Sequence, residues 1–278
     1  MNRRIVLLKD TYVYYFRNYY RSKSFYLMFF MSILVSVLLT YLSFRYLNRL
    51  PTIANSAGLK LIGPNSQQIV LGYLWAFVLS TLPVFSSVFF GSPAISSEIE
   101  SKTAYHVFSL PIPRSILLTG KFLAAVTATI LIVITYSAFE SIVFQYIFGH
   151  IVLKLLYSIL VTFVFVFAIS GVTFLISSIF NKNTYAYISV LLIYLLVFNA
   201  GTIIIELLYK VTPYYLLNEA ETLVERVFLN FSFGITTSIP ASISASPHEI
   251  IADVLIMALY AIISFGITLI LFERKEVR

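Results

Sequence analysis

Six long apolar stretches constrain the fold of this chain more than any other feature. They lie at 25–44, 69–90, 116–139, 153–180, 185–207 and 250–272. A helix of about 20 apolar residues spans the roughly 30 Å hydrocarbon core of a bilayer, where lipid offers no partner for an unpaired backbone group. The stretches are too continuously apolar for the alternating pattern of a membrane β-barrel. The sequence therefore predicts an all-α, polytopic membrane protein with six transmembrane helices.

The composition supports this fold class and excludes several alternatives. Hydrophobic residues make up 59% of the chain and charged residues only 11%, which is not the balance of a soluble domain. No segment between the apolar stretches has room for a separate soluble domain, so we expect a single transmembrane domain covering 1–278. The chain has no cysteine, which excludes disulfides, thiolate metal sites and a catalytic thiol.

Lys and Arg are distributed unequally between the two sides of the predicted bundle. If the N-terminus is cytoplasmic, thirteen of the 19 basic residues fall on the cytoplasmic side and six on the other. Because cytoplasmic loops carry the excess of basic residues, we expect both termini in the cytoplasm and the protein in the plasma membrane. The net charge of +7 then reflects topology and attraction to anionic lipid, and no nucleic acid is needed to explain it.

The N-terminal segment before the first span is amphipathic and basic. On a helical wheel one arc is apolar and aromatic, and the opposite arc carries charges that include Arg17 and Arg21. This pattern predicts an interfacial helix lying along the inner leaflet. We expect it to serve as a basic anchor with an aromatic belt, as a lever against a cytoplasmic partner, or as both.

The segment between the fifth and sixth spans is the longest connection on the opposite side. It includes a mildly amphipathic piece at 219–231, with Leu223, Val227, Phe228 and Phe231 at helical spacing. This piece is expected to lie in, or dip into, the outer leaflet. The other connections on that side are short and polar, as in simple turns.

The chain lacks the residues that a catalytic site or an ion-conducting path would require. His106, His150 and His248 fall at loop or interface positions, so we expect no metal or haem site within the bundle. Gly120-Lys121-Phe122 lacks the upstream glycine and the hydroxyl of a phosphate-binding loop. Glu140 and Glu206 fall near the outer ends of spans, where carboxylates at the water interface are expected.

A polar island at 92–121 interrupts the apolar sequence on the predicted cytoplasmic side. Ser97 and Glu100 have the spacing of a capping box, which predicts a short cytoplasmic helix from Ser97 to about Phe108. Pro111 should stop that helix, and Pro113 followed by Arg114 should start the third span.

The island resembles the signature of permease subunits in the type 2 ATP-binding cassette (ABC-2) exporter family. The pattern E-x-E-x-G-T…L-P-x-x-R…G-K is matched by Glu98, Glu100, Lys102-Thr103, Leu110-Pro111, Arg114 and Gly120-Lys121. Lys102 is the clearest departure, because many members have glycine there. The basic stretch before the first span and the six-span plan are similar to the family as well.

The resemblance implies a function as the membrane subunit of an exporter, with no ATP site of its own. A separate ATPase subunit would bind ATP and Mg²⁺, and a second permease chain would complete the substrate route. The short cytoplasmic helix would act as a coupling helix that docks on the ATPase, flanked by the N-terminal helix with Arg17 and Arg21. The docking residues would be Glu98, Glu100, Lys102, Thr103 and His106, and Pro111 and Arg114 would form the return into the membrane.

Other functions remain open at this level. A secondary, ion-coupled transporter would work without an ATPase, although the scarcity of buried carboxylates in the spans argues against it. A permease of the same type could also drive membrane remodelling or sensing. The transported substrate cannot be identified from the residues.

Overall fold

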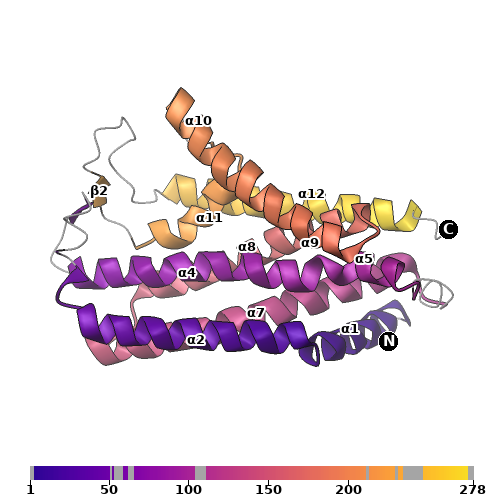
Figure 1. The fold of residues 1–278 in the computed structure, drawn as a ribbon, viewed down its shortest axis with the longest axis horizontal. Coiled ribbons are helices and arrows are strands. Elements are labelled where there is room, and N and C mark those ends of the chain that lie inside the picture. Colours follow the sequence, from indigo (N-terminus) through magenta and orange to yellow (C-terminus); the bar gives the residue numbers. More distant parts are fainter. Residues whose placement is uncertain are drawn as a thin grey trace.

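The structure, a computed structural model, is an elongated bundle of helices that run along its long axis (Figure 1). It describes residues 3–50, 52, 59–61, 66–103, 111–210, 213–228, 231–233 and 247–274. Six helical segments in this part of the chain are long and apolar enough to cross a membrane. The predicted fold class is therefore confirmed.

Each predicted span corresponds to a helical segment, and all but the fourth extend beyond their apolar stretches. The first span is α2 and the second is α4, which continues into the short helix α5. The third, fourth and sixth spans are α7, α8 and α12, and the fifth consists of α9, η1 and α10. The bounds are α2 Lys23–Tyr46, α4 Ser66–Gly91, α5 Pro93–Glu100, α7 Arg114–Phe148, α8 Leu153–Ile179, α9 Asn183–Leu192, η1 Ile193–Ala200, α10 Gly201–Tyr209 and α12 Pro247–Arg274.

The two ends of the bundle differ in what they carry. One end, called the near end, holds both chain termini and α5 (Figure 1). The opposite end, called the far end, holds the turn at Gly149 between α7 and α8. It also holds a small antiparallel ribbon of β1 (Leu59–Leu61) and β2 (Phe231–Phe233). The termini thus share one end, as an even number of spans requires.

The core lies between α4, α7 and α8. These three helices bury most of their residues within the protein, whereas α2, the fifth span and α12 bury only a minor share of theirs. Trp75 and Tyr136 are fully buried where α4 meets α7, and the Tyr136 hydroxyl donates a hydrogen bond to the Trp75 carbonyl at 2.9 Å. At Gly171, α8 approaches α12 closely, because an added Cβ would lie 3.2 Å from the Ala261 carbonyl oxygen.

The fifth span is not a uniform α-helix. Its central part, η1, is a π-helix, and α10 beyond it diverges from the bundle (Figure 1). π-Helical turns widen the backbone locally and often occur at functional positions. The divergence leaves room for α11 (Leu217–Arg226), which packs against α4, α8, α12 and η1. The amphipathic piece predicted at 219–231 is therefore a buried helix that begins two residues earlier and ends at Arg226.

One sequence-based expectation about a carboxylate is wrong. Glu140 was expected at the water interface, but α7 continues for two further turns, and the Glu140 side chain is fully buried. The predicted third span was too short because Glu140 and its polar neighbours lower the local hydropathy. Among the described residues, neither carboxylate oxygen of Glu140 has a hydrogen-bond partner.

Candidate functional site

The helix in the polar island lies earlier in the chain than predicted. α5 spans Pro93–Glu100, so Ser97 is inside its second half and does not cap its start. The Ser97 hydroxyl donates to the Pro93 carbonyl one turn back. The capping-box interpretation is therefore wrong. Pro93 is the first residue of α5, where the missing N–H of proline costs nothing.

A tight turn follows α5 and is exposed at the near end. The Ser101 and Lys102 amides donate to carbonyls of the last turn of α5, and Thr103 Oγ1 bonds Ser101 Oγ at 2.9 Å. Lys102 has φ +58°, in the left-handed region that favours glycine. This conformation explains why glycine suits this position. His106 lies outside the described residues, as does the rest of 104–110.

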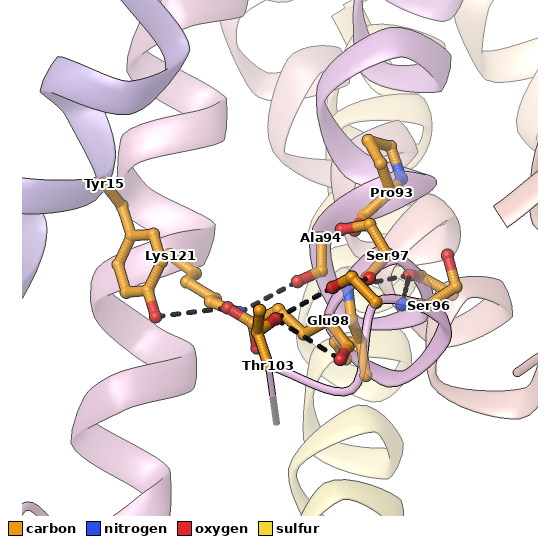
Figure 2. A network of polar contacts seen from close by, with 11 residues as sticks. Tyr15, Pro93, Ala94, Ser96, Ser97, Glu98, Thr103 and Lys121 are labelled. Atoms are coloured by element: carbon orange, nitrogen blue, oxygen red, sulfur yellow. Dashed lines mark hydrogen bonds and ion pairs between the residues drawn. The ribbon is translucent and has the colours of Figure 1, made fainter. Parts of the chain in front are cut away.

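Glu98 lies at the centre of a polar network that joins three helices (Figure 2). Its carboxylate forms an ion pair with Lys121 of α7 and accepts a 3.4 Å hydrogen bond from the Tyr15 hydroxyl of α1 (Arg3–Tyr20). Lys121 Nζ also donates to the Ala94 carbonyl of α5 at 2.9 Å and lies 4.7 Å from the centre of the Tyr15 ring. The Lys121 side chain is only 2% exposed. The network therefore satisfies a buried cation with a carboxylate, a carbonyl and an aromatic face.

Gly120 explains how α1 comes close enough to join this network. A Cβ at this position would lie 2.6 Å from Thr11 Cγ2 and 3.2 Å from the Tyr12 backbone nitrogen. Only glycine accommodates such an approach without displacement of one helix. The Gly120-Lys121 pair of the signature thus has two structural roles: the glycine admits α1, and the lysine binds Glu98.

α5 is also fixed to α8 and α9. The backbone N–H groups of Ile95 and Ser96, in the first turn of α5, both donate to Ser177 Oγ of α8, at 3.0 and 3.1 Å. Glu100 Oε2 accepts a 2.8 Å bond from the Asn183 amide at the start of α9. A carboxylate at a helix N-terminus satisfies an orphan N–H and interacts favourably with the helix dipole.

Arg114 forms the corresponding contact at a helix C-terminus. α7 begins at Arg114, directly after Pro113, as the sequence predicted. Arg114 Nη1 donates a 2.9 Å bond to the Glu273 carbonyl in the last turn of α12. A cation is favourable at this end of a helix, where carbonyls lack intrahelical partners. Pro111 is exposed, and the segment that it was expected to terminate lies outside the described residues.

The aromatic arc of α1 faces the protein. The Tyr12 hydroxyl donates to Thr127 Oγ1 of α7 at 3.2 Å, and the Tyr19 ring packs edge-on against Phe90 of α4. Burial, followed by the charge of Glu98, raises the pKa of Tyr15 well above its usual value, so its hydroxyl stays a hydrogen-bond donor. Arg17 and Arg21 are exposed. The predicted helix is confirmed, and its position at the membrane surface stays a prediction.

A small cleft lies beside this network, between α1 and α5. Its volume is about 190 Å³. Its lining includes Tyr15, Asn18, Tyr19, Ser97, Glu98 and Lys121. These elements together form what we call the α5 hub: α5 and the turn after it, tied to α1, α7, α8 and α9 by the contacts above. A displacement of α5 would be transmitted to all four helices, because each of them is bonded directly to α5.

Comparison with known proteins identifies the family. The model of the family described as "ABC-2 family transporter protein" matches residues 16–277, which is nearly the whole chain. The chain belongs to the ABC-2 transporter family. It is therefore an ABC-type permease and a multi-pass membrane protein, and permeases of this family lack an ATPase site and generally work with an ATPase subunit. A search among curated proteins found no match.

The contacts of the hub were only partly foreseeable. Glu98, Glu100 and Arg114 stand where the signature places them, but the structure gives all three intramolecular partners. Lys121 had no role assigned to it, and neither did Ser177, which accepts from α5 across the bundle. The signature glycine and lysine were the signal for Lys121. A serine within an apolar helix gave no comparable signal for Ser177.

Proposed function

We propose that this chain is the permease subunit of an ABC exporter, with the near end cytoplasmic and the α5 hub docked on a separate ATPase subunit. The observation that carries this proposal is the hub itself, in which one short helix with an exposed turn is fixed to four other helices. ATP and Mg²⁺ would be bound by the partner, and a second permease chain would complete the transporter in the plasma membrane.

The docking surface consists of the exposed residues after the middle of α5. Glu100, Lys102 and Thr103 are exposed at the near end, whereas Glu98 is turned inward to Lys121. We therefore assign Glu100, Lys102 and Thr103 to contact with the ATPase, and His106 remains with them as a sequence-based proposal. Glu98 would hold α5 in place, so that movement of the docked partner reaches α1 and α7 without loss.

Site-specific cross-linking tests this assignment. A photo-reactive amino acid at Lys102 should capture an ATP-hydrolysing subunit in membranes from the native host. The same amino acid at Gln145, near the far end of α7, is the matched control and should not capture it. An equal yield at the two positions, or no ATPase at Lys102, would overturn the docking assignment.

Coupling is tested by charge reversal in the reconstituted transporter. Glu100→Lys should weaken ATPase docking or uncouple hydrolysis from transport, because it repels the Asn183 amide and inverts the charge of the exposed surface. The inserted protein should remain folded, since Glu100 is at the surface. Normal coupled transport by Glu100→Lys would contradict the proposal.

A further inference from the structure

α11 is a re-entrant helix that rises from the middle of the bundle toward the far end. Just before it, the Tyr215 carbonyl accepts a 3.0 Å bond from Tyr260, near the middle of α12. Its Val224 carbonyl accepts a 2.8 Å bond from Ser158, close to the far end of α8. After its last turn, the Phe228 ring packs 6.4 Å from that of Phe144, near the far end of α7.

Two carboxylates one helical turn apart hold α11 to its neighbours. Both oxygens of Glu221, which is 4% exposed, lie 2.9 Å from the Tyr194 hydroxyl of η1. Glu225 Oε1 accepts a 2.9 Å bond from the Ser80 hydroxyl near the middle of α4. Tyr73 of α4 also hydrogen-bonds Glu225. These contacts place two carboxylates about halfway between the ends of α4 and of the fifth span.

Arg226, the basic residue of α11, contacts carboxylates other than Glu221 and Glu225. Arg226 Nη1 lies 3.4 Å from Glu219 and 3.8 Å from Asp253 of α12. α8 contributes the Ser158 hydroxyl, which faces the α11 backbone. In the described part of the chain, Glu221 and Glu225 thus accept hydrogen bonds from hydroxyl groups of η1 and α4.

A buried carboxylate is costly when ionised, and hydrogen bonds from hydroxyl groups offset only part of that cost. Burial is the main cause that raises the pKa of Glu221, to about 8; the hydrogen bond from Tyr194 lowers it in part, and the charge of Glu225 raises it. Burial also raises the pKa of Glu225. Among the described residues, no group of three His, Cys or acidic side chains is placed to hold a metal ion. A proton is therefore the cation that this arrangement suits.

We propose that α11 is a proton-controlled latch. With Glu221 and Glu225 protonated, α11 stays packed between α4, η1, α8 and α12. When the carboxylates ionise, hydration favours their withdrawal toward the far face, and α11 loosens from the bundle. This inference does not rest on the ATPase partner, because none of its contacts involves α5 or the turn that follows it.

The absence of cysteine permits a direct test. Ala220, which is fully buried on α11, is replaced by cysteine, and the purified protein in lipid nanodiscs is treated with a membrane-impermeant maleimide. Because thiolate formation itself depends on pH, each rate is divided by that of Ile151→Cys, an exposed site in the far-end turn. The ratio should rise by ~10-fold or more between pH 6 and pH 9, which corresponds to a tenfold change in the equilibrium between packed and loosened α11.

Neutral variants decide whether the carboxylates are responsible. In the Glu221→Gln/Glu225→Gln background the ratio should stay low at every pH, because the amides cannot ionise. Glu206→Gln on α10 is the matched control and should keep the pH dependence. A ratio that does not change with pH in the parent, or one that still rises in the double variant, would overturn the proposal. If Ala220→Cys does not assemble, Thr222→Cys on the same helix gives the same readout.

Discussion

At the near end Glu98 faces a lysine, whereas in the far half Glu221 faces a tyrosine hydroxyl. Glu100 and Arg114 each bind a helix terminus whose dipole has the opposite sign to their own charge. Glu225 extends the far-half pattern with the hydroxyl of Ser80. Glu98 is thus balanced by a cation, whereas Glu221 and Glu225 are held by neutral hydroxyl donors.

This difference separates a rigid region from a titratable one. Glu98 and Lys121 form a direct ion pair that also contacts α1 and α5, so the α5 hub is suited to transmit displacement. A carboxylate held by hydroxyl groups gains or loses a proton as conditions change, so α11 is suited to respond. Four predictions test the contrast, from the largest expected effect to the smallest.

Breaking the near-end ion pair should have the largest effect. Lys121→Ala leaves the mostly buried Glu98 without its cation, and we expect a loss of about 2–3 kcal/mol in stability, below the range for a fully buried pair because Glu98 is partly exposed. Thermal unfolding in detergent measures the loss. The double variant Glu98→Gln/Lys121→Met removes both charges and should recover most of it. A double variant as unstable as Lys121→Ala would show that packing, not charge, dominates.

The far-half carboxylates should make stability fall as pH rises. The raised pKa of Glu221 means that its contribution is fully present below its usual pKa of about 4.5 and is lost as pH rises through about 8. We expect the unfolding midpoint to drop by several degrees between pH 5 and pH 9, a change of a few kcal/mol at most. Glu221→Gln should make the slope shallower, and an unchanged slope in that variant would contradict the assignment.

The approach of α1 to α7 can be tested at two glycines that differ only in their surroundings. Gly120→Ala introduces a Cβ 2.6 Å from Thr11 Cγ2, whereas Gly266→Ala on α12 meets nothing within 4 Å. We expect the first to lose about 1–2 kcal/mol from overpacking and the second to gain a fraction of that from helix propensity. Thr11→Ala should partly rescue Gly120→Ala. Equal unfolding midpoints for the two alanine variants would show that α1 is not held by this contact.

The smallest expected effect concerns backbone strain in two turns. Lys102 and Lys210 have φ of +58° and +54°, so glycine at either position should stabilise the protein by up to about 1 kcal/mol. Thermal unfolding should therefore show similar gains for Lys102→Gly and Lys210→Gly. Because Lys102 is also a proposed docking residue, Lys102→Gly alone should alter stimulation of the ATPase. A change in ATPase stimulation by Lys210→Gly as well would remove the distinction between the two turns.

The apolar stretches predicted the six spans because hydrocarbon imposes its requirement on every residue of a span. Helix ends were predicted less well: α7 continues to Phe148, past the polar residues around Glu140. Start signals were reliable where proline restricts the backbone, as at Arg114, and unreliable at Ser97. A serine three residues before a glutamate also occurs inside helices, as Ser97 does in α5.

The site was predicted at the level of the chain segment and not of the contacts. The signature pointed to Glu98, Glu100 and Arg114, but their partners are distant in sequence and could not be paired from one chain. The carboxylates of α11 were overlooked because they lie outside the apolar stretches, and re-entry into the bundle depends on the divergence of α10. The amphipathic face of α1 was assigned to lipid because a face that packs on a polytopic bundle has the same pattern.

The contact between Tyr12 and Thr127 has a consequence for biosynthesis, since 115 positions separate the two residues. α1 leaves the ribosome long before the helix on which it packs, and contacts this distant in sequence form late. Until α7 has been inserted, the aromatic arc of α1 needs temporary cover, and an amphipathic basic helix finds it at the headgroup layer of the membrane. We therefore expect α1 to be accessible to protease in nascent chains that stop before residue 114 and protected in those that extend past residue 148.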